Sequence, residues 1–295
     1  MDSALPPGKS SATLGVLCGV GAAVCWAIGF VAARQGINDG VSPMIIALHR
    51  FVWPGLAFFP LIARDGFAEL RRIGWQRGVV LTLVGGLPLS ILSYAGFLFV
   101  PLGHGGVIQP SCASLGGLLL ASVVLKEPLP RRRVFGALAI VAGLVIIGVE
   151  ALHTMGVHGL LGDFMFAVAG CMFAIFGMLL RLWRIEPIPA VAVTSVLSLL
   201  GIPLILPYAG NIASAGLFEN VLQAVVQGGL ASAGAIYLFA RGVVLLGASR
   251  AAVIPSLVPP STLLIGYLAL GVVPSLSQLI GLVIVVIGFQ LTQKA

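Results

Sequence analysis

Two long apolar stretches of this chain, residues 105–125 and 250–270, are each interrupted near the middle by prolines and polar side chains. A polar group inside a bilayer is costly unless it faces a protein partner or a wet cavity. Broken helices at matching places in the two halves of a membrane protein therefore point to a site where a small molecule is hydrogen-bonded. The alternative for each serine is that a small side chain permits close helix packing. The residues concerned are Gln109, Ser111, Ser114, Ser256 and Pro259.

A second place where the residues could do chemistry is the adjacent pair His49 and Arg50, about ten residues from the end of the apolar stretch 43–62. Arg50 stays charged and can pair with the carboxylate of a ligand. It can equally bond carbonyls freed by Pro54 and brace the bundle, and the sequence leaves both roles open. His49 is the only titratable group that we expect at depth. We expect it to be buried and neutral, which argues against obligatory proton coupling.

Other polar and aromatic residues lie inside the apolar stretches, away from the interfaces where Trp and Tyr usually anchor a membrane protein. An apolar cavity with aromatic walls would suit an aromatic or large apolar ligand, and filling of the core is the alternative. The full set of candidate binding residues is Trp26, His49, Arg50, Ser90, Tyr94, Gln109, Ser111, Ser114, Gln227, Tyr237, Ser256 and Pro259. Ser93 and Phe173 accompany them. By contrast, we expect Asp163, Glu150, Arg34 and Glu127 to lie at helix ends in contact with solvent.

The elements that carry these residues are apolar segments long enough to cross a bilayer. The chain is 59% hydrophobic and only 8% charged, which leaves too little polar surface for a soluble globule. Ten segments can be placed, at 14–33, 43–62, 78–100, 105–125, 134–150, 160–180, 189–208, 220–240, 250–270 and 276–292. The sequence thus predicts an all-α integral membrane protein with ten transmembrane helices.

The distribution of basic residues predicts the orientation in the membrane. With a cytoplasmic N-terminus, the cytoplasmic loops and ends hold fourteen of the sixteen Lys and Arg residues. Both termini are then cytoplasmic, and the chain is a multi-pass protein of the cell (inner) membrane. The net charge of +7 comes from these short clusters, so we expect the lipid bilayer and no nucleic acid as a partner.

The chain also resembles itself at a spacing of 145 residues. Pro110 and Gly136 in the first half align with Pro255 and Gly281 in the second. Five helices per half is an odd number, so the second half enters the membrane from the opposite side. We therefore predict two inverted five-helix repeats, 14–150 and 160–292, as in secondary transporters.

Several other classes of protein are disfavoured. We find no metalloprotease or nucleophile-elbow motif, and no intramembrane carboxylate cluster suited to a metal, so a membrane enzyme is not expected. The four cysteines fall within apolar segments and form no CxxC pair, and we expect no metal and no cofactor. A facilitative, channel-like carrier remains open as an alternative to alternating access.

Particular stretches of the chain resemble a known family. CWAIGFVAAR, SPMIIALHRF and IQPSCASLGGLLLASVVLKEPLPRRRVFGALAIVAG look like one EamA domain, and the second half looks like another. The whole chain is similar to the drug/metabolite transporter superfamily, and most of all to YddG-like exporters of aromatic amino acids. It departs from the pattern where Arg34 replaces a common Lys, and where Gly271-Val272-Val273 stands in place of a Lys-Glu-Pro motif.

This resemblance implies a ten-helix basket around a central cavity, with the fifth and tenth helices at the periphery. It implies a secondary transporter that exports amino acids or related small metabolites by alternating access. An exporter of drugs or other metabolites is the alternative. The protein would act as a monomer or a homodimer.

Overall fold

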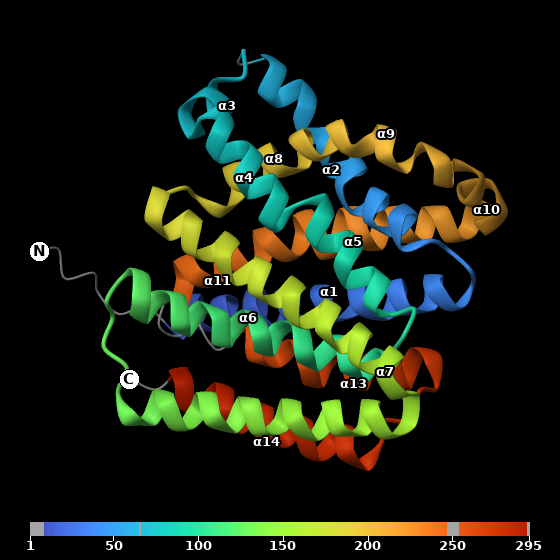
Figure 1. The fold of residues 1–295 in the computed structure, drawn as a ribbon. Helices are drawn as coiled ribbons and strands as arrows, with labels where there is room; N and C mark the ends of the chain where they lie inside the picture. The colour runs from blue at the N-terminus through green and yellow to red at the C-terminus, as the bar shows by residue number, and fades with distance from the viewer. Residues whose placement is uncertain (1–8, 65, 247–253, 294–295) are drawn as a thin grey trace, which may run out of the picture.

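The computed structural model describes residues 9–64, 66–246 and 254–293, and within these ranges the secondary structure is helical, without strands (Figure 1). In chain order the α-helices are α1 (Lys9–Asn38), α2 (Pro43–Arg64), α3 (Ala68–Ile73), α4 (Trp75–Gly85), α5 (Leu87–Gly96), α6 (Leu102–Val124), α7 (Arg131–Trp183), α8 (Pro187–Ser198), α9 (Ile202–Ile205), α10 (Ala209–Gln223), α11 (Ala235–Leu246), α13 (Val258–Leu270) and α14 (Leu276–Gln293). Turns of 3-10 helix cover Leu199–Gly201, Leu206–Tyr208 and Ile254–Leu257, and a π-helical stretch, Ala224–Gly234, joins α10 to α11.

Seven helical runs among the described residues are long and apolar enough to cross a bilayer. Two of them, the 53 residues of Arg131–Trp183 and the 60 residues of Pro187–Leu246, far exceed the roughly 20 residues that one crossing needs. Each contains a glycine with non-helical backbone angles, Gly156 (φ 65°, ψ −151°) and Gly216 (φ 79°, ψ 165°). Glycine adopts these angles at little cost, and the ribbon turns back on itself in both regions (Figure 1). The prediction of an all-helical, multi-pass membrane protein is confirmed at this level.

Two predicted helices are interrupted, and the residues at each break explain why. The predicted helix 78–100 divides at Gly86 (φ −103°, ψ −142°), where two glycines precede Pro88 at the start of α5. The predicted helix 189–208 is regular only to Ser198, since Pro203 and Pro207 each lack the backbone N–H that a continuous helix requires. The predicted loop 63–77 contains the short helix α3.

The first segment of α7 and the antiparallel helix α14 lie side by side, and their backbones touch at glycines (Figure 1). A methyl group added at Gly136 would lie 2.7 Å from the carbonyl oxygen of Gly288, and one added at Gly288 would lie 2.7 Å from that of Gly136. Gly143 and Gly281 oppose each other in the same way, at 2.7 and 3.0 Å. At the repeat spacing of 145 residues, Gly281 corresponds to Gly136 and Gly288 corresponds to Gly143. The contact of Gly136 with Gly288 is thus repeated by the contact of Gly281 with Gly143, as a local two-fold axis requires.

The glycine contact leads to a matched pair of substitutions on one helix. Gly143→Ala should destabilise the protein by about 1–3 kcal/mol relative to Gly148→Ala. The methyl group at position 143 would clash with the backbone of α14, which cannot move aside, whereas the one at position 148 would point into open space. Both changes gain a similar helix propensity, so their difference isolates the contact. Unfolding of the purified proteins in detergent micelles measures it, and equal stabilities would contradict the close approach of α7 and α14.

Candidate binding site in the helix bundle

A line of hydrogen-bonded side chains connects α2, α5 and the α10–α11 region, and we call these five residues the polar chain: Arg50, Tyr94, Gln227, Gln223 and Glu219. Arg50 Nη1 donates to Tyr94 Oη at 3.2 Å, and Tyr94 Oη donates to Gln227 Oε1 at 2.8 Å. Gln227 Nε2 donates to Gln223 Oε1 at 3.2 Å, and Gln223 Nε2 donates to Glu219 Oε1 at 2.8 Å. Gln223 and Gln227 are fully buried and Tyr94 is 4% exposed.

The polar chain is tied to α1 through backbone carbonyls. Gln227 Nε2 also donates to the Gly29 carbonyl and Gln223 Nε2 to the Ala32 carbonyl, both at 2.8 Å. Small residues permit this approach, since a methyl group at Gly36 would lie 2.8 Å from Gln223 Nε2. Gln227 lies within the π-helical stretch, a distortion that is common where a helix carries a functional side chain.

His49 lies beside the polar chain, and its hydrogen bonds define its state. The Trp53 ring N–H donates to His49 Nδ1 at 2.9 Å, so that nitrogen carries no proton. His49 Nε2 is 3.1 Å from Asn220 Oδ1, while Asn220 Nδ2 donates to the carbonyls of Ile212 and Gly216 at 2.7 and 2.6 Å. The Asn220 oxygen is therefore the acceptor, and His49 is the neutral tautomer with its proton on Nε2.

Helix α6 runs without a break from Leu102 to Val124 with Pro110 inside it, so the predicted interruption in the first half is not found. In the second half a turn of 3-10 helix precedes α13, and α6 and α13 pack directly against each other. A methyl group at Gly106 would lie 2.5 Å from Thr262 Cγ2. Ser111 is fully buried and donates to the Val107 carbonyl of its own helix at 2.7 Å, and Ser256 is 4% exposed. Among the described residues, Gln109 Oε1 is buried without a hydrogen-bond partner, so it is a polar atom available to a ligand.

The structure therefore separates the predicted site residues into groups. His49, Arg50, Tyr94 and Gln227 come together at the polar chain. The residues carried by α6, by α13 and by the turn before α13 form a second group, which comprises Gln109, Ser111, Ser114, Ser256 and Pro259. Ser90 is buried on α5, one helical turn before Tyr94. Trp26 contacts Phe239 with ring centroids 5.6 Å apart, whereas Tyr237 and Phe173 lie apart from both groups and are 56% and 47% exposed.

Sequence reasoning missed three members of this region, Glu219, Asn220 and Gln223. The spacing of Glu219, Gln223 and Gln227 at intervals of four residues places them on one helix face, and this spacing was the available signal. Glu219 was overlooked because it precedes the apolar segment 220–240, yet the fold leaves it only 8% exposed.

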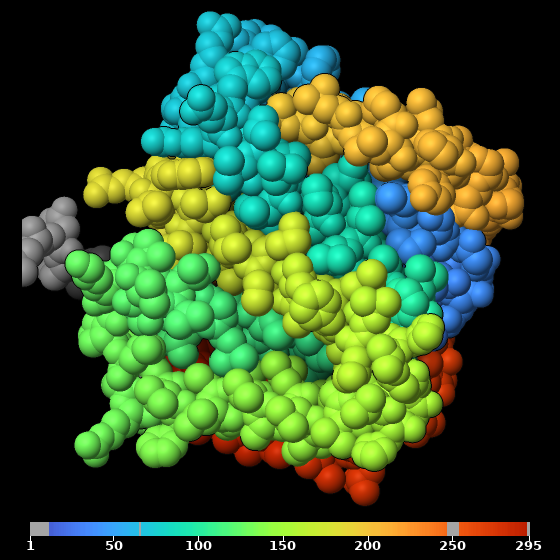
Figure 2. Space-filling model, viewed as in Figure 1, coloured from blue at the N-terminus to red at the C-terminus, as the bar shows by residue number. Residues whose placement is uncertain are grey.

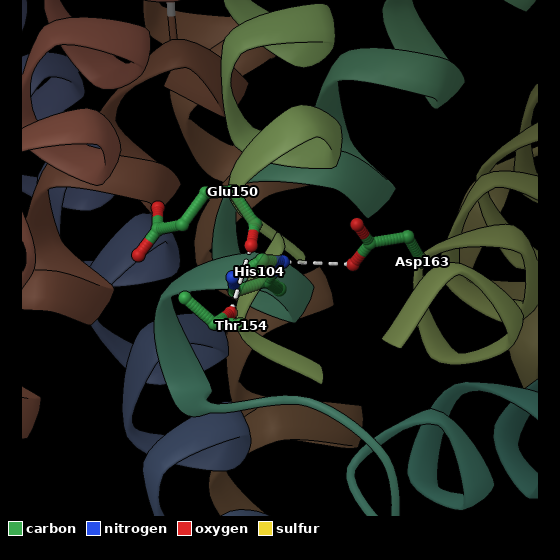
Figure 3. Close-up of polar contacts among 4 residues, drawn as sticks. All are labelled: His104, Glu150, Thr154 and Asp163. Carbon is green, nitrogen blue, oxygen red and sulfur yellow. Dashed lines mark hydrogen bonds and ion pairs between the residues drawn. The ribbon is translucent and has the colours of Figure 1, made fainter. Parts of the chain in front are cut away.

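The expectation that Asp163 is solvated is wrong. Asp163 is 8% exposed and its Oδ1 lies 2.8 Å from Nδ1 of the fully buried His104, so His49 is not the only buried titratable group either (Figure 3). The reason is that α6 and the second segment of α7 pack together just inside their ends. Arg34 is half-buried and donates to the Phe97 carbonyl, whereas Glu127 pairs with Arg181 at 2.6 Å at an exposed position.

Comparison with known proteins identifies the family. The model of the EamA-like transporter family matches residues 13–149 and, separately, residues 160–292. The chain belongs to the EamA-like transporter family. It is accordingly a multi-pass membrane protein of a family that transports small metabolites.

The fold of this EamA-like chain has a counterpart among solved structures. One, described only as the crystal structure of a protein, superimposes with a TM-score of 0.60 at 18% identity and covers 96% of this chain and 97% of its own. At that identity the likeness concerns the fold alone. No curated protein sequence matches the chain significantly.

The hydrogen bonds of the polar chain predict a loss of stability when the Tyr94 hydroxyl, which links Arg50 to Gln227, is removed. Tyr94→Phe should destabilise the protein by about 1–3 kcal/mol, since it leaves the buried Gln227 Oε1 and Arg50 without their shared hydroxyl. Tyr237→Phe, which removes a hydroxyl from an exposed ring, should change stability little. Unfolding in mixed micelles compares the two. A Tyr94→Phe protein as stable as Tyr237→Phe would show that the polar chain contributes nothing.

Proposed function

We propose that this protein exports amino acids, preferentially aromatic or large apolar ones, by alternating access. The observation that carries the proposal is the polar chain, in which the Arg50 guanidinium lies inside the bundle beside a tyrosine hydroxyl. A charge at this depth is costly and is retained where it faces a partner or a substrate. Within the described residues no other hydrogen bond from Arg50 is found, which leaves donors of its five-donor guanidinium for a substrate carboxylate.

The preference for aromatic substrates is supported by rings near the polar chain. Trp26 lies one helical turn before Gly29, the residue whose carbonyl holds Gln227. Phe97 contacts Phe30 and Phe166, with ring centroids 6.2 and 4.8 Å apart, one turn beyond Tyr94. Such rings favour an apolar side chain through area and edge-to-face contacts.

Alternating access requires two halves that exchange roles, and we propose that residues 14–150 and 160–292 are inverted five-helix repeats. The reciprocal glycine contacts between α7 and α14 support this arrangement. The non-helical glycines 156 and 216 divide the two longest apolar runs, which supports a count of ten crossings. The family match to each half separately supports it as well.

The test of the substrate is flux through proteoliposomes that contain the purified protein. Labelled phenylalanine, tryptophan and leucine should exchange across the membrane, and Arg50→Gln should slow the exchange about 10- to 100-fold, which corresponds to a charged hydrogen bond of about 1.5–3 kcal/mol. Arg241→Gln, at an exposed position of α11, is the control. Phenethylamine lacks the carboxylate, so Arg50→Gln should affect its flux much less than that of phenylalanine.

Two results of this assay would reject parts of the proposal. If the unmodified protein moves none of the amino acids, the substrate class is wrong and an exporter of drugs or other metabolites takes its place. If unlabelled substrate on the far side fails to accelerate the movement of labelled substrate, the protein behaves as a channel rather than as an alternating-access carrier.

We further propose that the protein lies in the cell (inner) membrane with both termini cytoplasmic, which the asymmetry of Lys and Arg supports. Reporter fusions that are active on one side only can be placed at Gly103, Met155 and Ala295. An external reporter should be active at Gly103 and Met155 and silent at Ala295. Activity of the external reporter at Ala295 would reverse the assignment.

A further inference from the structure

His104 and Asp163 form a buried pair that the polar chain does not use. His104 lies in the first turn of α6 and is fully buried, and Asp163 lies on the second segment of α7 with 8% of its surface exposed. Their nearest atoms, Nδ1 and Oδ1, are 2.8 Å apart, and the close-up shows the two side chains pointing toward each other across the gap between the helices (Figure 3).

The sequence Gly103-His104-Gly105-Gly106 explains why this histidine is so enclosed. A methyl group added at Gly103, Gly105 or Gly106 would lie 2.4–2.5 Å from Gln278 of α14, Phe166 of α7 and Thr262 of α13, respectively. Three helices thus approach α6 through positions that have no side chain. His104 lies between these glycines and is fully buried.

Two polar atoms of the pair are left over. Among the described residues, His104 Nε2 and Asp163 Oδ2 are buried and have no hydrogen-bond partner. If His104 is neutral and Asp163 ionised, the pair carries a negative charge in a medium of low dielectric constant, which is strongly unfavourable. One additional proton makes the pair neutral as a whole, either as imidazolium and carboxylate or as imidazole and carboxylic acid.

Among the described residues, no hydrogen bond or ion pair joins either side chain of the pair to a further charged group. The described residues of α13 and α14 include no Asp, Glu, Lys, Arg or His, and their polar contribution near the pair is Thr262 and Gln278. Titratable or charged groups on the elements packed around the pair include Tyr267 on α13, Arg34 on α1, Tyr94 on α5, Cys112 on α6, and Glu150, His153, His158 and Cys171 on α7. Arg34 is engaged by the Phe97 carbonyl, Tyr94 belongs to the polar chain, and Figure 3 shows the Glu150 carboxylate pointing away from the pair.

A cleft reaches Asp163 from the surface of the bundle. It has a volume of about 270 Å³, lies between α6 and the two segments of α7, and is lined by Asp163 together with apolar residues that include Ile108, Cys112 and Leu144. Figure 2 shows the surface hollowed between the two segments of α7, with α6 behind. Asp163 lies seven residues beyond Gly156, about 10 Å along the helix from the turn that separates these segments.

We propose that His104 and Asp163 form a proton-binding site, which holds one proton while α6 and α7 are packed together and releases it when the cleft between them widens. On release the pair changes from zero net charge to one negative charge, and the proton passes to water that enters the cleft. The packed conformation is then favoured by protons. With the topology proposed above, these protons come from the external side.

The direct test follows His104 in the unmodified, full-length protein. Nitrogen chemical shifts of ¹⁵N-labelled histidine are recorded between about pH 5.5 and pH 8.5, the range in which histidine changes its charge, and His104→Gln identifies the signal. The His104 signal should change within this range, and Asp163→Asn should move the midpoint of the change by about one pH unit or more. His158→Gln, which removes an exposed histidine of α7, should leave it in place. A signal that is constant with pH, or a midpoint unaffected by Asp163→Asn, overturns the proposal.

A second measurement keeps the proposal testable should Asp163→Asn fail to fold. Cys112 lines the same cleft, so its reaction with a thiol reagent reports how open the cleft is. Labelling of Cys112 should increase more steeply with pH in the unmodified protein than in His104→Gln. The thiol chemistry is the same in both proteins, and the exposed Cys171 serves as the internal reference. Equal pH dependence in the two proteins overturns the proposal.

Transport provides a third measurement, which rests on the function proposed above. Phenylalanine exchange in proteoliposomes should vary with external pH in the unmodified protein and vary much less in Asp163→Asn. Exchange whose dependence on external pH is the same in both proteins argues against the proton site. If the unmodified protein moves no amino acid at any pH, the proposed function fails, while the histidine and cysteine measurements still decide the proton site.

Discussion

The structure depends on one constraint, which is that a chain surrounded by hydrocarbon has to satisfy its polar groups within itself. Gln223 and Gln227 show how this is done. Each amide is fully buried, and each donates both to a carbonyl of α1 and to a neighbouring side chain of its own helix. The polar chain therefore joins α1, α2, α5 and the α10–α11 region through hydrogen bonds that lie mostly in the buried interior, with Arg50 at the part-buried end. In a medium of low dielectric constant these hydrogen bonds are stronger than in water, and an unpaired polar group is correspondingly costly.

Glycine provides the second requirement, which is close approach. Apolar side chains gain little by leaving lipid for protein, so packing between membrane helices depends on small residues that let backbones meet. Gly136 and Gly143 hold α7 against α14 in this way, and the three glycines around His104 bring α13, α14 and the second segment of α7 onto α6. The same device thus serves two purposes. In one place it fastens peripheral helices, and in the other it excludes water from a titratable pair.

The two buried histidines illustrate how partners decide chemistry. His49 receives a hydrogen bond from the Trp53 ring and donates one to Asn220, so both ring nitrogens are occupied and the neutral form is held. His104 faces a carboxylate with one nitrogen and no described partner with the other. The same residue type is therefore placed once with both ring nitrogens hydrogen-bonded to neutral partners and once beside a buried carboxylate. An assessment by depth alone would treat the two histidines alike.

The sequence by itself determined the class of this protein. Long apolar segments require helices because the bilayer offers backbone groups no other partners, and clusters such as Arg131–Arg133 between the segments disclose the turns. It also indicated His49, Arg50, Tyr94 and Gln227, since polar residues at membrane depth are rare and need a reason. The tertiary structure alone decided which of these residues meet: it joined Arg50 to Tyr94 and left Tyr237 outside. It also buried Asp163, a residue that lies near a helix end in the sequence. Burial there depends on which neighbouring helix crosses that end. The sequence does not reveal this, because a contact between residues 59 positions apart leaves no periodic pattern in the chain.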